Sequence, residues 1–107
     1  VGTAHGAYRF APKLDFERIT AIREAIPETP LVLHGGSGLS DDDFRNTITN
    51  GIRKVNICTE MCLALHRAYA LTLEKGIGFE KSLEICKLTV QEVVKEKMML
   101  FGSAGRA

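Results

Sequence analysis

Two histidines, each followed directly by a glycine, are the residues of this chain best suited to chemistry. His5 follows a short segment that could be the end of a strand, and His34 follows a continuous apolar run. A neutral imidazole is the commonest transition-metal ligand, and catalytic zinc takes three protein ligands and one open position. Either histidine alone could simply hydrogen-bond a neighbouring backbone group. The repeated His-Gly pattern favours a metal site that takes its third ligand from elsewhere.

The second histidine opens a glycine-rich segment, residues 35–38, that suits a phosphate group. Consecutive backbone N–H groups in glycine conformations form an anion-binding nest, and Ser37 adds a hydroxyl. A helix start at Ser40 lies just beyond, and helix N-termini attract anions. The same composition is also common in flexible connectors, so the position of the segment between a buried strand and a helix is what favours a binding loop.

A third polar group follows the next expected strand. Asn56 and Thr59 bracket the end of that strand and the start of the following helix. His5, His34 and Asn56 are each separated by about one strand–helix unit. Ligands bind at the carboxyl ends of strands in such folds, so three consecutive units would direct two imidazoles, a glycine-rich loop and an amide toward one shared mouth.

Hydrophobic periodicity predicts the elements that would hold these residues in place. Helices are expected at residues 15–26, 40–50, 59–73 and 79–98, and strands at 1–4, 31–33 and 52–57. Strands that alternate with helices imply a parallel sheet with right-handed crossovers, so the expected class is α/β. The residues that recur at helical spacing along the last helix are Leu83, Cys86, Val90, Val93 and Val94.

Two other patterns resemble reactive sites. Cys58, Cys62 and His66 fall at i, i+4 and i+8 of an expected helix, but the outer two lie about 12 Å apart along its axis. They cannot share one ion, because zinc bonds are roughly 2.0–2.3 Å long, and core or boundary positions are expected for all three. Lys54 could suggest a Schiff-base lysine, but it alternates with Val55 and has no evident partner.

Composition excludes several classes of partner. Among the 107 residues, 14 Lys+Arg against 13 Asp+Glu give a net charge of +1, which offers no field for nucleic acid or an anionic membrane. No apolar stretch is long enough to span a bilayer, and no signal peptide is visible. Three cysteines argue against a disulfide scaffold and for a reducing compartment, so a cytoplasmic location is expected.

The motifs, taken in order, resemble the class II, zinc-dependent ketose-bisphosphate aldolases, which comprise the fructose-bisphosphate and tagatose-bisphosphate enzymes. The matching segments are residues 2–6 (GTAHG), 31–38 (LVLHGGSG), 54–60 (KVNICTE) and 101–107 (FGSAGRA). The resemblance covers the whole chain but only the C-terminal part of that fold. It implies about three βα units plus a terminal helix of a (β/α)₈ TIM barrel, with residues 1–107 as one segment of a single barrel domain whose upstream segment is missing.

The resemblance also assigns roles to residues. It implies that His5 and His34 are two of the three zinc-binding histidines. The residues it places around the dihydroxyacetone phosphate part of the substrate are Gly6, Gly35, Gly36, Ser37, Asn56, Ile57, Cys58 and Thr59. Cys58 departs from the residue expected at its position, often Asp, Ala or Asn. A backbone contact there would survive the change, whereas a side-chain role would not.

The chemistry that the resemblance implies is reversible cleavage of a ketose 1,6-bisphosphate, either fructose or tagatose, to dihydroxyacetone phosphate and glyceraldehyde 3-phosphate. In the family, zinc acts as the Lewis acid that polarises the ketone and stabilises the enediolate. The family's general base is an aspartate from an earlier strand, and nothing in this chain corresponds to it. The chain alone is therefore expected to be inactive, and the intact enzyme to be a cytoplasmic homo-oligomer of carbohydrate metabolism and glycolysis, a dimer or tetramer.

Two alternatives compete with this reading. The first is a small phosphate-binding module without chemistry, whose binding would be indifferent to metal chelators. The second is a structural role in which the three units pair with themselves or with another chain, because an open three-stranded parallel sheet exposes two edges and an apolar face.

Overall fold

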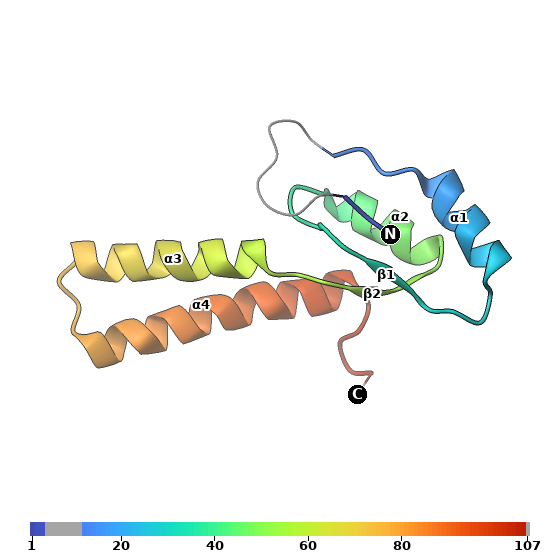
Figure 1. Cartoon of the computed structure of the whole chain (residues 1–107). Coiled ribbons are helices and arrows are strands. Elements are labelled where there is room, and N and C mark those ends of the chain that lie inside the picture. The colour runs from blue at the N-terminus through green and yellow to red at the C-terminus, as the bar shows by residue number, and fades with distance from the viewer. Residues whose placement is uncertain (4–11, 107) are drawn as a thin grey trace. The chain divides into compact units, whose positions relative to one another are not determined.

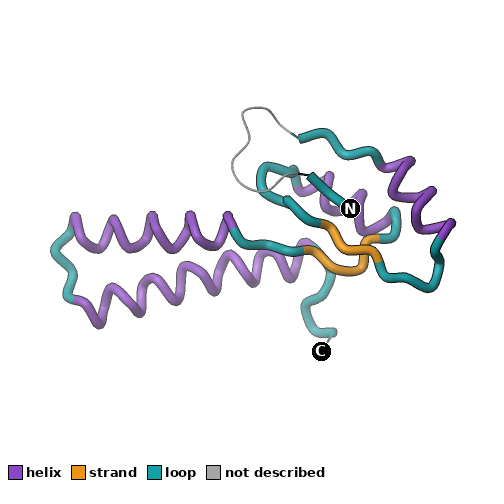
Figure 2. Tube along the Cα trace, viewed as in Figure 1, coloured by secondary structure: helices purple, strands orange, loops and turns teal. Residues whose placement is uncertain are grey.

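A computed structural model describes residues 1–3 and 12–106 of the chain. The chain divides into two compact units, Val1–Ile57 and Cys58–Ala107, and each is described by itself. Figure 1 labels the helices and strands, and Figure 2 distinguishes them from the loops.

The first unit alternates helices and strands, as the periodicity predicts. Its elements are α1 (Phe16–Ala25), β1 (Leu31–Leu33), α2 (Asp41–Thr49) and β2 (Ile52–Val55). β1 and β2 pair in parallel, with Leu31 opposite Ile52 and Leu33 opposite Val55. The predicted parallel pairing is therefore confirmed, although β2 ends two residues earlier than expected. The strand expected at residues 1–4 is represented, among the described residues, by a single parallel bridge between Gly2 and His34.

Both helices of the first unit begin at the residues expected to cap them. The Asp15 side chain accepts a hydrogen bond from the Arg18 N–H, at 2.9 Å. At α2, Ser40 and Asp43 form a reciprocal capping box in which each side chain accepts from the other residue's backbone N–H. Gly51, with φ of +114°, turns the chain out of α2 in a conformation that side-chain-bearing residues rarely adopt.

The core of the first unit sits around β1, β2 and α2. Leu33, Phe44 and Ile52 are fully buried, and α2 packs against β2 while α1 packs against α2. Thr47 is also buried, and its hydroxyl donates to the Phe44 carbonyl at 2.8 Å, so no polar group is left unsatisfied there. This core holds the ends of both strands in place.

The second unit is a helical hairpin of α3 (Thr59–Glu74) and α4 (Phe79–Leu100), joined by a short turn (Figures 1 and 2). A seam of small side chains lets the helices approach closely; it is formed by Ala64, Ala68, Thr72, Ser82 and Cys86. The Lys97 ammonium lies 3.0 Å from the Glu60 carboxylate, so an ion pair joins the start of α3 to the last turns of α4. The hairpin is therefore antiparallel.

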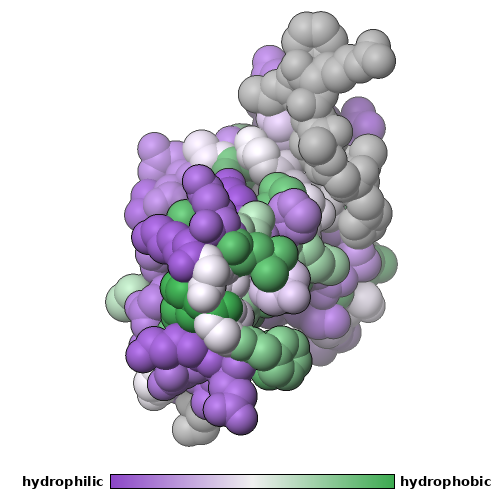
Figure 3. All heavy atoms as spheres, turned by 90° about the vertical axis from the view of Figure 1, so that its left-hand side faces the viewer, coloured by the Kyte–Doolittle hydropathy of each residue, from purple (hydrophilic) through white to green (hydrophobic). Residues whose placement is uncertain are grey.

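The apolar residues that recur at helical spacing along α4 do not all lie in the seam. Cys86 is buried, but Leu83 is 51% exposed and Val94 is 38% exposed. The seam is narrow because its residues are small, so larger apolar residues beside it stay at the surface. Figure 3 looks onto the end of the hairpin and shows hydrophobic side chains exposed among hydrophilic ones. Leu73 and Phe79, which flank the turn in the sequence, are 61% and 69% exposed. No helix within the described ranges is both long and apolar enough to cross a membrane.

Candidate functional site

Three chain segments of the first unit are held side by side by backbone hydrogen bonds. The His34 N–H donates to the Val1 carbonyl at 2.9 Å, and the Thr3 N–H donates to the His34 carbonyl at 3.1 Å. On the other side of β1, the Asn56 N–H donates to the Leu33 carbonyl at 3.1 Å. These bonds place Thr3, His34 and Asn56 in a row at the carboxyl ends of the parallel segments, where the sequence predicts a ligand site.

The His34 imidazole is in contact with the Asn56 side-chain amide. Its Nδ1 lies 3.2 Å from the Asn56 Nδ2 atom, and the histidine is exposed to solvent. If Nδ1 carries the lone pair, the Asn56 amide nitrogen donates to it. If the Asn56 amide is flipped, its oxygen accepts a hydrogen bond from a protonated Nδ1, and Nε2 is left to bind a metal. A partner of this kind fixes the orientation of a metal-binding imidazole. The positions of these two residues in the sequence predict that they lie at one mouth, and the structure brings them together.

The glycine-rich loop is fixed from two directions and is not a free connector. Gly35 and Gly38 have φ of +69° and +81°, and the Thr3 hydroxyl donates to the Gly35 carbonyl. Gly36 is buried against the Phe44 ring, where an added Cβ would lie 3.1 Å from the ring atom Cε1. A side chain at position 36 would therefore press on the ring, which would have to shift by a few tenths of an ångström. The loop is therefore a shaped part of the site.

In the chain, α2 follows the glycine-rich loop and α3 follows the end of β2, and the two helices differ in the state of their N-terminal donors. At α2 the Ser40–Asp43 capping box occupies the first backbone N–H groups, and three acidic residues crowd the first turn. At α3 the N-cap is Cys58, whose side chain makes no capping hydrogen bond. Backbone N–H groups that no side chain caps are available to an anion. The start of α3 therefore suits a phosphate better than the start of α2, on which the sequence analysis placed part of the argument.

The remaining predicted site residues are placed as follows. His5 and Gly6 lie outside the described residues. Ser37, Asn56 and Ile57 are half-buried in the first unit, while Cys58 and Thr59 open α3 in the second. Lys54 is exposed on β2. Thr3 is a site residue to which the sequence analysis assigns no role. Nothing in its residue type or spacing signals this role.

The expectation that Cys58, Cys62 and His66 occupy core or boundary positions is wrong, because all three are exposed. The Cys58 and Cys62 sulfur atoms lie 3.8 Å apart and share a hydrogen bond. That hydrogen bond, together with the charge of Cys58, raises the pKa of the Cys62 thiol above its ordinary value. In the described part of the chain, no three His, Cys, Asp or Glu residues are grouped so that they could hold a metal ion.

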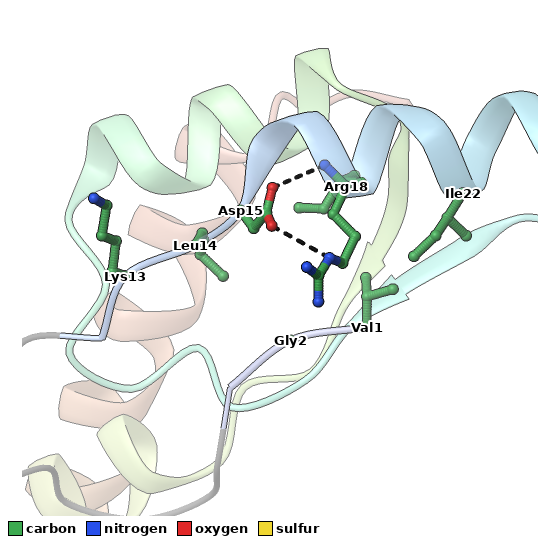
Figure 4. A pocket seen from close by; sticks show the side chains of 8 residues that line it. Val1, Gly2, Lys13, Leu14, Asp15, Arg18 and Ile22 are labelled. Carbon is green, nitrogen blue, oxygen red and sulfur yellow. Dashed lines mark hydrogen bonds and ion pairs between the residues drawn. The ribbon is translucent and has the colours of Figure 1, made fainter.

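A small cavity of about 180 Å³ lies between the N-terminal segment and α1 of the first unit (Figure 4). Val1 and Gly2 border it on one side, and Asp15, Arg18 and Ile22 on the other. The Asp15 carboxylate lies 3.2 Å from the Arg18 guanidinium nitrogen Nε, so these two charges pair with each other. We therefore assign it no part in the candidate site.

Comparison with known proteins gives consistent matches over the whole chain. The model of one family, described as "Fructose-bisphosphate aldolase class-II", matches residues 1–106. The uncharacterized protein YdjI of Escherichia coli (strain K12) is 41% identical over 108 residues, which covers 100% of this chain and 37% of YdjI. The chain thus spans little more than a third of the length of that relative.

Two solved structures resemble the chain closely. The crystal structure of the YdjI aldolase from Escherichia coli K12 superposes with a TM-score of 0.84 and 41% sequence identity, covering 90% of this chain and 36% of that protein. The structure of a candidate fructose-1,6-biphosphate aldolase from Coccidioides immitis has a TM-score of 0.81 and 26% identity, covering 98% of this chain and 38% of that one.

Proposed function

We propose that this chain, which belongs to the class II fructose-bisphosphate aldolase family, supplies part of the metal site and the phosphate-binding side of an aldolase active site. The observation that carries the proposal is the contact between the exposed His34 imidazole and Asn56 across the ends of two parallel strands. A (β/α)₈ barrel places its active site at this end of its strands. In the proposal the chain is the C-terminal segment of such a barrel, about three βα units and a terminal helix, and the upstream segment completes it.

The residues proposed to hold zinc are His34 and His5. His34 fits this role because its ring is exposed, lies at a strand end and is held by Asn56. Zinc, when bound, supplies a Lewis acid that polarises the ketone of the substrate. Asn56 orients the imidazole and keeps one ring nitrogen engaged. The third ligand and the general-base aspartate are proposed to come from the upstream segment of the barrel.

The phosphate of the substrate is proposed to lie against backbone N–H groups of the glycine-rich loop and of the start of α3. The residues assigned to it are Gly6, Gly35, Gly36, Ser37, Asn56, Ile57, Cys58 and Thr59. The Thr3 hydroxyl and the Phe44 ring fix the loop in shape before any ligand binds. A loop fixed in this way binds without the entropy cost of ordering it.

For the intact enzyme we propose reversible cleavage of fructose or tagatose 1,6-bisphosphate to dihydroxyacetone phosphate and glyceraldehyde 3-phosphate. We further propose that it works as a cytoplasmic homo-oligomer without nucleic-acid or membrane partners. The chain alone lacks the base, so it is expected to show no cleavage of either bisphosphate in the presence of zinc. Cleavage of either bisphosphate by the purified chain would contradict the proposal that the general base comes from the upstream segment.

Zinc titration of the purified chain tests the metal site. Loss of a partner that orients a metal ligand costs about 10- to 100-fold in affinity, so Asn56→Ala is expected to weaken zinc binding by that factor and His34→Ala by more. His66→Ala is the matched control, because His66 is an equally exposed histidine on α3. Equal zinc binding by the His34 and His66 variants would refute the site. Phosphate binding that is indifferent to chelators and to these variants would favour a phosphate-binding module.

A further inference from the structure

The exposed thiol pair at the start of α3 is a second reactive feature of this chain. Cys58 and Cys62 are both accessible to solvent, and their sulfur atoms are 3.8 Å apart. The third cysteine, Cys86, is 4% exposed in the seam between the two helices of the hairpin. A small oxidant in solution can therefore reach the pair but not the third thiol.

The pair can close to a disulfide only if the first turn of α3 changes. A disulfide needs its sulfurs about 2.05 Å apart and its Cβ atoms about 3.5–4.5 Å apart, whereas residues four apart on a regular helix have Cβ atoms roughly 5–6 Å apart. Cys58 is the N-cap and lies outside the helix, with φ of −141° and ψ of −62°, and its side chain makes no capping hydrogen bond. It can move toward Cys62 without losing a cap.

We propose that Cys58 and Cys62 form a peroxide-sensitive dithiol whose oxidation to an intrachain disulfide reshapes the first turn of α3. A disulfide that strains the helix and is exposed to solvent is readily reduced again, which is the property of a reversible modification. The inference goes beyond the aldolase chemistry, and its effect on ligand binding rests on the proposed function of residues 56–59.

The reaction uses a hydroperoxide as oxidant and balances in two steps. One thiolate attacks a peroxide oxygen, so that an S–O bond forms as the O–O bond breaks, and the departing hydroxide takes up a proton to leave as water. The second thiol then attacks the sulfenic sulfur, the S–S bond forms, and the sulfenic oxygen leaves as a second water. Two thiols are oxidised, and one molecule of hydrogen peroxide is reduced to two waters.

The environment of the two sulfurs assigns them different roles in these steps. The hydrogen bond between the two sulfurs, and the negative charge of Cys58, raise the pKa of the Cys62 thiol. The thiolate is the nucleophile, so the raised pKa of Cys62 favours Cys58 as the sulfur that attacks the peroxide. Cys62 is the thiol that resolves the sulfenic acid.

The consequence for ligand binding follows from where Cys58 lies. It joins the strand end at Asn56 to the first turn of α3, whose uncapped N–H groups are proposed to bind the substrate phosphate. Drawing Cys58 toward Cys62 moves these donors. We expect the oxidised chain to bind dihydroxyacetone phosphate about tenfold more weakly, the cost of roughly one lost hydrogen bond to a charged group.

Peptide mapping of the peroxide-treated chain tests the dithiol. Both cysteines fall in one tryptic peptide, residues 55–67, and Cys86 falls in another, residues 82–87. After peroxide treatment and alkylation under denaturing conditions, the first peptide is expected to have lost two hydrogens and to carry no alkyl group. The Cys86 peptide is expected to carry one alkyl group. A dithiol reductant restores both sites in the first peptide. Full alkylation after peroxide, or a disulfide between two chains, would overturn the proposal.

Titration with dihydroxyacetone phosphate tests the link to the proposed site. Cys62→Ser is expected to bind this probe like the reduced wild-type chain before peroxide and to form no intrachain disulfide after it, while Cys86→Ser weakens on oxidation as the wild type does. Equal affinity of the reduced and oxidised wild-type chain would overturn the link. No binding by the reduced chain would instead refute the proposed phosphate segment and the link with it, and the peptide map would still decide the dithiol.

Discussion

Replacing Leu33 with alanine tests whether the core of the first unit positions the candidate site. The Leu33 side chain is 0% exposed, its carbonyl accepts the Asn56 N–H at 3.1 Å, and His34 follows it in the chain. Truncating a fully buried leucine costs about 2–5 kcal/mol of stability, because the transfer energy is lost and a cavity remains. We expect Leu33→Ala to cost about 3 kcal/mol, near the middle of this range, because this side chain is completely enclosed.

Hydrogen exchange measured by mass spectrometry reports this loss locally. A cost of about 3 kcal/mol corresponds to exchange faster by roughly a hundredfold, expected at the amides of β1, β2 and Asn56. Leu33→Met keeps the volume nearly constant and should cost less than about 1.5 kcal/mol, and it remains informative if Leu33→Ala does not fold. Exchange in Leu33→Ala within a few-fold of the wild type would refute the view that this residue holds the two strand ends together.

Three further predictions concern the helix ends and the thiol pair. Ser40→Ala should lower the free energy of unfolding by about 1 kcal/mol, measured by urea denaturation, because the capping box is lost. Gly51→Ala should lower the free energy of unfolding more than Gly76→Ala in the same assay. Both glycines have a positive φ, but a Cβ at position 51 would meet the Arg23 side chain at 2.4 Å, whereas a Cβ at position 76 would meet nothing. Equal costs for the two substitutions would contradict this. Replacing Cys58 with serine should lower the pKa of Cys62 toward its ordinary value of 9.0. Alkylation of Cys62 should then be faster at pH values below that pKa. An unchanged dependence of the alkylation rate on pH would show that the sulfur contact does not raise the pKa of Cys62.

Much of the fold could be predicted because its signals are local. Asp15 and Ser40 are good caps by residue type, and the apolar run at residues 31–33 is short enough to be a buried strand. The burial of single helix positions was less predictable, as Leu83 and Val94 show. Periodicity identifies the apolar face of a helix, but the width of the contact depends on the partner, and the small residues of α3 make this contact narrow.

The candidate site was predictable where it depends on strand order and unpredictable where it depends on side-chain contacts. His34 and Asn56 could be brought together from sequence because consecutive parallel strands end at the same edge of a sheet. The role of Thr3 could not, since a threonine that anchors a loop looks like any other threonine in a strand. The contact between Gly36 and the Phe44 ring likewise depends on how α2 packs, which periodicity does not specify.

The starts of α2 and α3 show how capping decides which helix can offer its first backbone N–H groups to an anion. At α2 the Ser40 and Asp43 side chains satisfy the donors that an anion would need, and the acidic first turn repels it. At α3 the N-cap is Cys58, and a thiol is a weak hydrogen-bond acceptor compared with the side chain of an Asp or Asn. The same side chain places a thiol 3.8 Å from the Cys62 sulfur. We infer that Cys58 keeps the start of α3 open to a phosphate and at the same time makes it sensitive to oxidation.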